Sequence, residues 1–385
     1  MKNAYNPLIG RIMKRLREKV QSYFNPVDLT KPNLYFEESR YDTRSVLMPL
    51  YILKTRACSW YLASGGCTMC GYQLVSTLGD KISDEAIMKQ VKYIPKRTPP
   101  EKYPFITVVS SGSFFDPMEV HDKLFDKIMR FLHDSGFEWI NTESRPEFAL
   151  IDRRLDIYSK YFPEHVSVSL GLETVSDFVR INIINKGFRT DLYLRATKNL
   201  RKYGVRYDAF VFFGKPIMTE YENIEDAYQT MKFAFSTGID YVILMVANIQ
   251  PGTFTEWLWK KKMYKPPWLW SVLEAVKKLP RSLRERVIIK GMFRAMPEPL
   301  LYARNCELCT QTVIDSIGRF DLTGDYEHLA ELEDICECKN IWAEEMDRQK
   351  GEKIPLEERV RKVLSLAANE ILGEKISPED VPIIK

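Results

Sequence analysis

The run PLYILKT (residues 49–55) is followed almost at once by CSWYLASGGCTMCGY (residues 58–72). The first run is short, apolar and rich in bulky side chains, which is typical of a buried β-strand. The second contains Cys58, Cys67 and Cys70, three of the seven cysteines of the chain, in the spacing C-x8-C-x2-C. Together the two stretches predict a strand that leads directly into a loop of thiols.

Similar apolar runs recur along the first two thirds of the chain. Further candidate strands lie at residues 105–111, 139–144, 165–173, 207–214 and 241–249. Amphipathic segments such as HDKLFDKIMRFLHDSG lie between most of them and have helical periodicity. Alternating strands and helices are typical of a parallel sheet with right-handed crossovers. The sequence therefore predicts an α/β fold built on a partial (β/α)6 barrel, similar to a TIM barrel.

An unusual motif follows each candidate strand. SSGSFFD, ESRPE, GLET, GKP and QPGT come after the second to the sixth strand, as the cysteine loop comes after the first. In β/α barrels the active site is built at the carboxyl ends of the strands. We therefore expect these motifs to meet at one rim of the barrel.

The composition is that of an ordinary globular protein, with 45% hydrophobic and 28% charged residues among 385. A formal net charge of +4 is compatible with a nucleic-acid partner. The first residues lack the apolar stretch and the cleavage site of a signal peptide, and no apolar run is long enough to span a membrane. We expect a cytoplasmic protein with no membrane partner, whose reduced cysteines act as metal or redox ligands.

Three thiols without a fourth ligand distinguish the cysteine loop from a structural zinc site, which needs four ligands. No histidine stands beside them, and the nearest downstream aspartate is Asp80. A [4Fe–4S] cluster held by three cysteines has one open iron, which a small molecule can occupy. Glycines let the backbone pass close to such a cluster, and the loop contains Gly65, Gly66 and Gly71.

This loop resembles the cysteine motif of the radical S-adenosylmethionine superfamily. The resemblance implies that Cys58, Cys67 and Cys70 hold a [4Fe–4S] cluster whose open iron is chelated by S-adenosylmethionine. The first interval between cysteines is shorter in most of that superfamily. A long interval is found in the branch that resembles the radical domain of the Elongator catalytic subunit, and the chain is expected to belong to that branch.

The resemblance also implies roles for the other motifs. The residues expected to bind S-adenosylmethionine are Ser111, Gly112, Ser113, Glu143, Arg145, Glu173 and Gln250. Lys215 and Glu173 are expected to be catalytic. The alternative for each polar side chain is a structural hydrogen bond at the rim of the barrel. Lys186 and Arg189 are expected either to meet an anionic substrate or to be solvated.

Over most of its length the chain resembles the archaeal radical enzymes of archaeosine synthesis. The resemblance covers the cysteine loop, ESRPE, GLET, the GKP segment, ANIQPGTFTEWLW and the later cysteine pairs. It implies a tRNA substrate with a lysine adduct of 7-cyano-7-deazaguanine at position 15, cleaved at a C–N bond. It also implies an electron donor and an association with the lysine-transferring synthase subunit. The alternatives are another radical RNA-modifying enzyme, such as a wobble-uridine type, and a catalytically silent zinc-dependent RNA-binding protein.

A second set of cysteines lies near the C-terminus. Cys306-x2-Cys309 and Cys336-x-Cys338 supply four thiolates, enough for a closed tetrahedral zinc site. An auxiliary iron–sulfur cluster is the alternative. Between the pairs, VIDSIGRFDL alternates like a short β-hairpin. Arg304, Arg319 and Lys339 lie near these cysteines and could contact RNA.

The predicted domains are an N-terminal helical extension (1–40), the radical barrel (41–255) and a C-terminal region with the four-cysteine site and terminal helices (256–385). The N-terminal segment is expected to be a helix packed on the body, with RNA or membrane-surface contact as alternatives. The stretch EWLWKKKMYKPPWLW (residues 256–270) interleaves basic and aromatic residues. This pattern suits binding to RNA phosphates and bases, but it equally suits tryptophans packed beneath a solvated lysine face.

Overall fold

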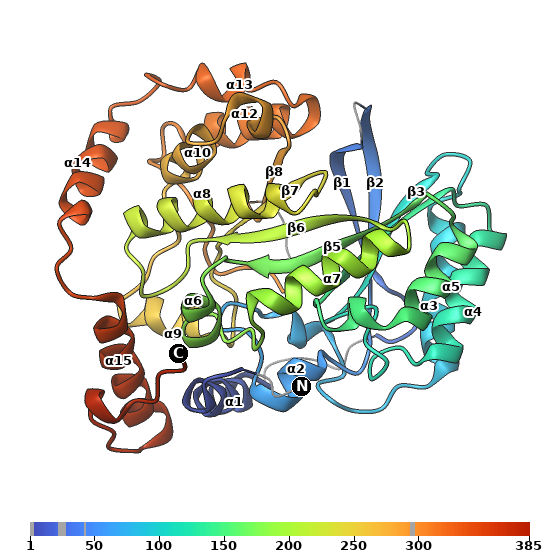
Figure 1. The fold of residues 1–385 in the computed structure, drawn as a ribbon, viewed down its shortest axis with the longest axis horizontal. Helices are drawn as coiled ribbons and strands as arrows, with labels where there is room; N and C mark the ends of the chain where they lie inside the picture. The colour runs from blue at the N-terminus through green and yellow to red at the C-terminus, as the bar shows by residue number, and fades with distance from the viewer. Residues whose placement is uncertain (1–3, 22–27, 42–43, 293–296) are drawn as a thin grey trace.

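One curled sheet with the strand order β1 to β8 forms the centre of the computed structural model (Figure 1). The structure describes residues 4–21, 28–41, 44–292 and 297–385. The strands are β1 (Asn33–Tyr41), β2 (Arg44–Leu53), β3 (Phe105–Ser110), β4 (Trp139–Ser144), β5 (Val166–Glu173), β6 (Arg206–Phe213), β7 (Val242–Val246) and β8 (Val287–Lys290). β1 and β2 are antiparallel, and every later neighbouring pair is parallel.

The predicted partial barrel is confirmed, because β2 to β7 are the six strands expected from the sequence. Two further strands were not predicted. β1 lies within the segment expected to be a helical extension, and β8 is only four residues long. β1 carries charged residues in EESR and is recognisable as a strand only by its pairing with β2.

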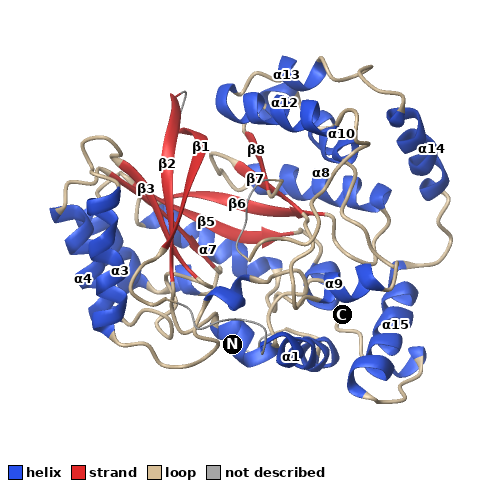
Figure 2. Cartoon of the chain, turned by 180° about the vertical axis from the view of Figure 1, so that it is seen from behind, coloured by secondary structure: helices blue, strands red, loops and turns tan. Residues whose placement is uncertain are grey.

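The chain also forms many helices, and several of them cover the convex face of the sheet (Figure 2). The longer ones are α1 (Pro7–Gln21), α3 (Asp84–Arg97), α4 (Asp122–Asp134), α5 (Asp152–Tyr161), α7 (Thr190–Lys202), α8 (Glu220–Ser236), α10 (Leu269–Lys277), α12 (Thr310–Thr323), α14 (Cys338–Lys350) and α15 (Leu356–Ala367). The shorter ones are α2 (Ser59–Ser64), α6 (Asp177–Asn182), α9 (Phe254–Lys260), α11 (Arg281–Arg284), α13 (Glu327–Ala330), η1 (Tyr72–Val75), η2 (Phe148–Leu150), η3 (Ala368–Leu372) and η4 (Pro378–Asp380).

The alternation of side chains along β5 separates the hydrophobic core from the barrel interior. Val166, Val168 and Leu170 are buried in the core between the sheet and the helices. Ser167 and Ser169, which alternate with them, line the concave face. Successive strand residues point to opposite faces of a sheet, so the core holds the sheet in place while the inner face stays polar.

Helices α1 and α15, from the two ends of the chain, lie side by side (Figure 1). Ile12 and Met13 of α1 share a buried cluster with Val360 and Leu364 of α15. The expectation of an N-terminal helix packed on the body is therefore confirmed for α1. The three domain ranges stay a prediction. In the described residues, no helix has the length and apolar character needed to cross a membrane.

The hairpin predicted between the C-terminal cysteine pairs is wrong, because the segment forms helix α12. Its buried side chains are Val313, Ile317 and Phe320, which recur with the period of a helix rather than of a strand. Gly324 ends the helix in the left-handed conformation at φ 74°. The short apparent alternation in VIDSIGRFDL concealed this longer period.

Candidate active site and metal centre

The carboxyl ends of β2 to β7 form one rim, and the cysteine loop lies across it. Cys58 begins the loop and precedes α2, and its backbone N–H donates to Oε1 of Gln73 at 3.1 Å. The amide nitrogen of the same glutamine donates to the carbonyl of Ser111 at 3.4 Å. Gln73 is buried, so it ties the loop after β2 to the loop after β3. The sequence analysis did not single out Gln73.

The sulfur atoms of the three loop cysteines are not gathered as closely as the ligands of a single metal ion. Among the described residues, only the four C-terminal cysteines bring their sulfur atoms within 4.8 Å of one another. A single metal ion needs ligand atoms that close together, whereas a cubane cluster places each thiolate on a different iron. Burial raises the pKa of Cys58 to about 12 and of Cys67 to about 11. As thiolates these groups therefore need a nearby positive charge, which iron would supply.

The glycine motif after β3 fits tightly against the cysteine loop. A Cβ on Gly112 would lie 2.5 Å from Cα and Cβ of Cys58, so only glycine allows this approach. The hydroxyl of Ser111 is buried and has no hydrogen-bond partner among the described residues. Such an orphaned group at the rim is suited to a polar ligand, as expected for S-adenosylmethionine.

Glu119 supports this motif and was missed by the sequence analysis. Its carboxylate accepts from the N–H of Ser113 at 2.7 Å and from the hydroxyl of Thr55 at 2.8 Å. Burial raises its pKa to about 7. Six residues separate Glu119 from Ser113, in a turn that gives no sequence signal of its role.

The two residues of the ESRPE motif that were predicted to bind the cofactor lie in different surroundings. Glu143 lines the barrel cavity, and burial raises its pKa to about 7. Arg145 is buried, and its Nε donates to Glu147 at 2.6 Å while Nη2 donates to the carbonyl of Lys186 at 2.7 Å. Its backbone N–H donates to the Ser113 hydroxyl at 2.7 Å. Arg145 thus joins the rim loops after β3, β4 and β5.

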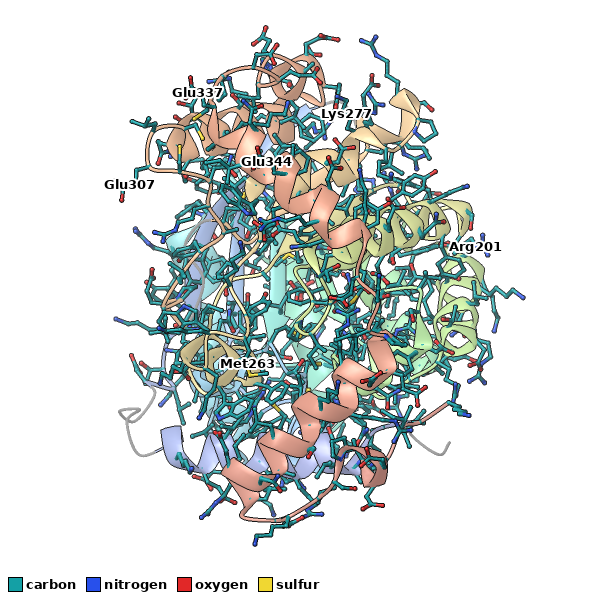
Figure 3. The ribbon with its side chains drawn as sticks, turned by 90° about the vertical axis from the view of Figure 1, so that its left-hand side faces the viewer. Arg201, Met263, Lys277, Glu307, Glu337 and Glu344 are labelled. Carbon is teal, nitrogen blue, oxygen red and sulfur yellow. The ribbon has the colours of Figure 1, made fainter. Side chains whose placement is uncertain are left out.

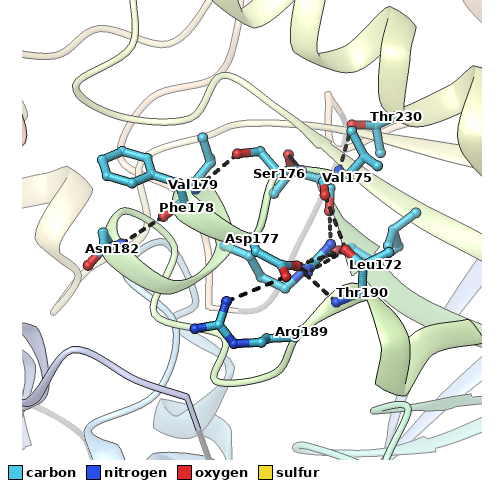
Figure 4. Close-up of polar contacts among 12 residues, drawn as sticks. Leu172, Val175, Ser176, Asp177, Phe178, Val179, Asn182, Arg189, Thr190 and Thr230 are labelled. Atoms are coloured by element: carbon cyan, nitrogen blue, oxygen red, sulfur yellow. Dashed lines mark hydrogen bonds and ion pairs between the residues drawn. The ribbon is translucent and has the colours of Figure 1, made fainter. Parts of the chain in front are cut away.

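Glu173 ends β5 with a φ of 66°, beside a register shift in the ladder with β6. Its carboxylate forms a buried ion pair with Lys186. Asp177 fixes the segment between these residues, since its carboxylate accepts from the N–H of Thr190 at 2.9 Å (Figure 4). Arg189 also pairs with Asp177, at 3.7 Å. The sequence left open whether Lys186 and Arg189 meet a substrate or are solvated. In the structure Lys186 lies at the site and pairs with Glu173, whereas Arg189 pairs with Asp177 farther out.

Gln250 closes the rim from β7. Its Oε1 accepts from the backbone N–H of Gly71 at 2.5 Å, and a Cβ on Gly71 would lie 2.7 Å from the same oxygen. The structure thus connects Gln250 directly to the cysteine loop.

Lys215 does not join the rim network. Its side chain is fully buried, with Nζ 2.8 Å from Asp226 and bonded to the carbonyl of Phe212. Asp226 also accepts from Thr174 at 2.7 Å. The ammonium is held inside the protein by Asp226 and a backbone carbonyl, and this arrangement gives no support to the predicted catalytic role of Lys215.

A cavity of about 790 Å³ extends below the rim along the concave face of the sheet. Tyr72 and Glu143 lie at the end of the cavity nearest the rim. At the opposite end, Trp139 begins β4 and Asp240 precedes β7. Volumes of this size are typical of small-molecule sites. Of the cysteine loop, residues 58–72, Tyr72 lines this cavity.

The four C-terminal cysteines form a second centre. The sulfur of Cys306 lies 3.6 Å from that of Cys309 and 3.4 Å from that of Cys336, and Cys309 lies 3.5 Å from Cys338. A tetrahedron with metal–sulfur bonds of about 2.3 Å has edges of about 3.8 Å, so the set fits one ion. Glu307 and Glu337, exposed neighbours of these cysteines, lie at one corner of the molecule (Figure 3).

The basic aromatic stretch is largely paired with acidic residues and packed. Nζ of Lys260 lies 2.6 Å from Glu256, Nζ of Lys261 lies 2.6 Å from Glu370, and Nζ of Lys265 lies 3.1 Å from Glu345. Trp270 is buried, and its indole N–H donates to Sγ of Cys338 at 3.3 Å. The tryptophans therefore include structural residues, while the lysines keep exposed side chains.

Comparison with curated proteins finds close relatives among archaea. The chain is 31% identical over 294 residues to the archaeosine synthase subunit beta of Methanosarcina acetivorans, covering 76% of this chain and 82% of that protein. It is 29% identical over 296 residues to the subunit of the same name from Thermococcus kodakarensis, covering 76% and 89%. An uncharacterized protein of Methanocaldococcus jannaschii is 28% identical over 369 residues, covering 92% and 98%. No protein-family model matches the chain.

Solved structures with a similar fold include radical S-adenosylmethionine enzymes. Methylornithine synthase has a TM-score of 0.45 and 12% identity, covering 83% of this chain and 91% of that one. The methyltransferase TsrM from Kitasatospora setae, with cobalamin and a [4Fe-4S] cluster bound, has a TM-score of 0.45 and 11% identity, covering 78% and 60%. The Elp3 protein of Methanocaldococcus infernus has a TM-score of 0.44 and 14% identity, covering 71% and 63%.

Proposed function

The chain belongs to the family of archaeosine synthase subunit beta, and from this premise we propose that it is a radical S-adenosylmethionine enzyme that modifies tRNA. The observation that carries the proposal is the three-thiol loop, joined by buried hydrogen bonds to the loops after β3 and β7 and opening on a cavity. A loop stabilised in this way is suited to hold a bulky cofactor at a fixed place above the barrel interior.

Cys58, Cys67 and Cys70 would hold a [4Fe–4S] cluster through their thiolates. Ser111, with its orphaned hydroxyl, and Gly112, which leaves room beside Cys58, would bind S-adenosylmethionine. The remaining predicted cofactor-binding residues are Ser113, Glu143, Arg145, Glu173 and Gln250. Ser113, Arg145, Glu173 and Gln250 already make hydrogen bonds or ion pairs between the rim loops, so we assign them to fixing the shape of the rim as well as to contacts with the cofactor. Glu143 makes none of these contacts and lines the cavity.

When bound, the cluster and S-adenosylmethionine would supply a 5′-deoxyadenosyl radical, given an external one-electron donor. The substrate we propose is the lysine adduct of 7-cyano-7-deazaguanine at tRNA position 15. Transfer of a hydrogen atom from the lysine side chain to that radical would form 5′-deoxyadenosine and leave a carbon radical next to the carbon of the C–N bond. Cleavage of this bond would release the side chain as an alkene and leave a nitrogen radical on the base, which a second electron from the donor and a proton would convert to the formamidine of archaeosine. The chain's own residues bind and orient the substrate and exclude water, since the reactive chemistry belongs to the cofactors.

The second centre would be structural. Four thiolates at the edge lengths of a tetrahedron leave no position for a substrate, and Trp270 donates to one of them. We therefore assign zinc to Cys306, Cys309, Cys336 and Cys338. A partner subunit that transfers lysine to the tRNA fits the subunit name of the relatives.

The decisive experiment is an anaerobic assay on lysine-modified tRNA, with mass analysis of the nucleosides. The expected result is archaeosine together with 5′-deoxyadenosine, and the loss of both in the reconstituted Cys67→Ala variant. Another modified nucleoside with 5′-deoxyadenosine would mean a different radical RNA-modifying enzyme. A colourless zinc protein that binds tRNA without making 5′-deoxyadenosine would overturn the enzymatic proposal.

A further inference from the structure

Three residues of the barrel interior form a row across neighbouring strands. Glu143 of β4 is opposite Ser169 of β5, and Ser169 is opposite Asp208 of β6. All three line the cavity. Neighbouring strands lie about 4.8 Å apart, so the backbones of Glu143 and Asp208 lie roughly 10 Å apart with Ser169 between them. We call Glu143, Ser169 and Asp208 the acidic row.

The serine of this row lacks a partner. Ser169 is 1% exposed, and its hydroxyl oxygen has no hydrogen bond to any described residue. Buried hydroxyl groups are nearly always hydrogen-bonded, because an unsatisfied one is energetically unfavourable. An orphaned hydroxyl between two carboxylates indicates a place where a ligand completes the hydrogen bonding.

No lysine or arginine in the described part of the chain pairs with the carboxylates of the row. Asp208 accepts only the backbone N–H of Tyr241 at 3.2 Å, and within the described part of the chain neither Asp208 nor Glu143 makes an ion pair. Burial raises the pKa of each to about 7, and for Glu143 the nearby Glu37 raises it further. An incoming cation would favour the charged form of both.

The cations around the cavity are committed elsewhere. Arg206 pairs with Asp240 at 2.7 Å, and Lys186 pairs with Glu173. Arg40 donates to the carbonyls of Glu285 and Val287. Lys290 donates to the carbonyl of Glu38 at 3.0 Å. Lys186 opposes the rise in the pKa of Glu143, and Arg206 opposes that of Asp208, but neither cation forms an ion pair with the row.

We infer that the acidic row binds a primary alkylammonium group of the substrate, with Asp208 and Glu143 as charged acceptors and the Ser169 hydroxyl as the neutral one. An ammonium group has three donors, and the row offers three acceptors that face the same cavity. The inference deepens the proposed function and rests on it only for the identity of the substrate, because a lysine adduct carries such a group. If the acidic row binds the substrate in this way, its three residues help to determine substrate specificity.

S-adenosylmethionine also carries an ammonium group and is the competing source of the cation. Ser169 lies four residues before Glu173, the end of β5, which corresponds to about 13 Å along the strand. Asp208 lies five residues before the end of β6. The cysteine loop lies at the rim, so a cofactor held there would leave the lower part of the row to a substrate side chain.

The test uses the full chain, reconstituted anaerobically, with n-butylammonium chloride as the probe and 1-butanol as its uncharged counterpart. Ligand-detected NMR should show binding of the ammonium and not of the alcohol. Asp208→Asn should weaken ammonium binding about 10- to 100-fold, because a hydrogen bond to a charged group is lost. Asn retains an oxygen that accepts the Tyr241 N–H, so the fold should be preserved. Asp191→Asn, on an exposed site of α7, is the matched control and should bind like the wild type.

Two further measurements show whether the ammonium group belongs to the substrate or to S-adenosylmethionine, and whether a variant is merely misfolded. The dissociation constant of S-adenosylmethionine should stay within about twofold in Asp208→Asn. Ser169→Ala, which removes only the hydroxyl, should weaken the ammonium several-fold. The inference fails if wild type does not bind n-butylammonium, if Asp208→Asn binds it equally well, or if the variant loses S-adenosylmethionine instead. Because the probe needs neither tRNA nor turnover, the inference stands or falls independently of archaeosine formation.

Discussion

The guanidinium of Arg17, on helix α1, donates a hydrogen bond of 2.8 Å to the backbone carbonyl of Cys70. The same Nη2 atom donates to the carbonyl of Cys67 at 3.1 Å. Arg17 is 5% exposed and lies over the ring of Tyr61 at 4.9 Å. Burial lowers the pKa of this guanidinium, and the charges of the nearby thiols oppose that effect. The N-terminal helix thus brings a buried positive charge to the cysteine loop.

Arg17→Leu should lower the midpoint potential of the proposed cluster. A cluster gains negative charge on reduction, so a buried cation nearby stabilises the reduced state. We expect a shift of about 60 mV, equivalent to about 1.4 kcal/mol for one electron, in a redox titration followed by electron paramagnetic resonance. Arg17→Lys should stay close to wild type because the charge remains.

Arg15→Leu is the matched control for this prediction, since Arg15 lies on the same helix but is exposed and pairs with Glu18. Its potential should equal that of wild type. If Arg17→Leu leaves the potential unchanged while the cluster still assembles, Arg17 only fixes the loop.

Replacing Lys260, Lys261 and Lys262 together by Ala should weaken binding of tRNA. Lys260 and Lys261 pair with glutamates, but exposed ion pairs contribute little and can exchange for phosphate contacts. The slope of log affinity against log salt should fall by about 2–3, since each lost phosphate contact removes about 0.9. Filter binding over a range of salt concentrations measures this slope.

The control for the lysine patch is a triple alanine variant on the outer helices α5 and α7, at Lys160, Lys198 and Lys202. It removes the same charge elsewhere, so it reports the effect of net charge alone. Equal slopes in the two triple variants would show that the patch is an ordinary solvated surface.

Cys309→Ser should remove zinc and leave the iron of the barrel in place. Cys309 is buried and immediately precedes α12, and Cys338 begins α14, so the metal ties these two helices together. Loss of the metal should therefore expose the region after about residue 300 to proteolysis. Metal analysis of wild type should give about one zinc and four irons per chain.

Cys58→Ser supplies the complementary comparison, because it should lose iron and keep zinc. A wild-type content of about eight irons without zinc would instead identify the C-terminal centre as an auxiliary cluster.

Glu220→Gln should change how stability depends on pH. Burial raises the pKa of Glu220 to about 7, although it accepts the N–H of Trp268 at 2.6 Å. The folded state therefore holds a proton that the unfolded state releases between about pH 4.5 and 7, and this residue's contribution to wild-type stability falls as pH rises through that range. Gln keeps the acceptor and cannot ionise.

The free energy of unfolding of Glu220→Gln relative to wild type should therefore increase by about 2 kcal/mol between about pH 5 and pH 8. Urea unfolding at both pH values measures this difference. If the difference in free energy of unfolding between the variant and wild type is the same at both pH values, Glu220 ionises in the folded protein near its ordinary pKa.

Much of the fold and one part of the site could be predicted from the sequence. The strands β2 to β7 were recognisable because a buried parallel strand is a short apolar run between turn residues, which is a local property. The cysteine spacing was also local, since three thiols in one loop must lie near each other. The weak strands β1 and β8 and the helical period of α12 were missed, because pairing and packing with distant segments determine them.

The sequence by itself determined the parallel barrel, the rim on which the strand-end motifs meet, and the two sets of cysteines. Only the tertiary structure decided what each polar residue does there. It places Arg17 against Cys70, Gln250 against Gly71 and Lys215 inside a closed pair with Asp226. Arg17 and Gln250 meet partners far along the chain, and which atoms meet depends on how the helices pack around the sheet. Hydrogen bonds and ion pairs act over a few ångströms, so their partners are determined by that packing and not by the residues adjacent in the sequence.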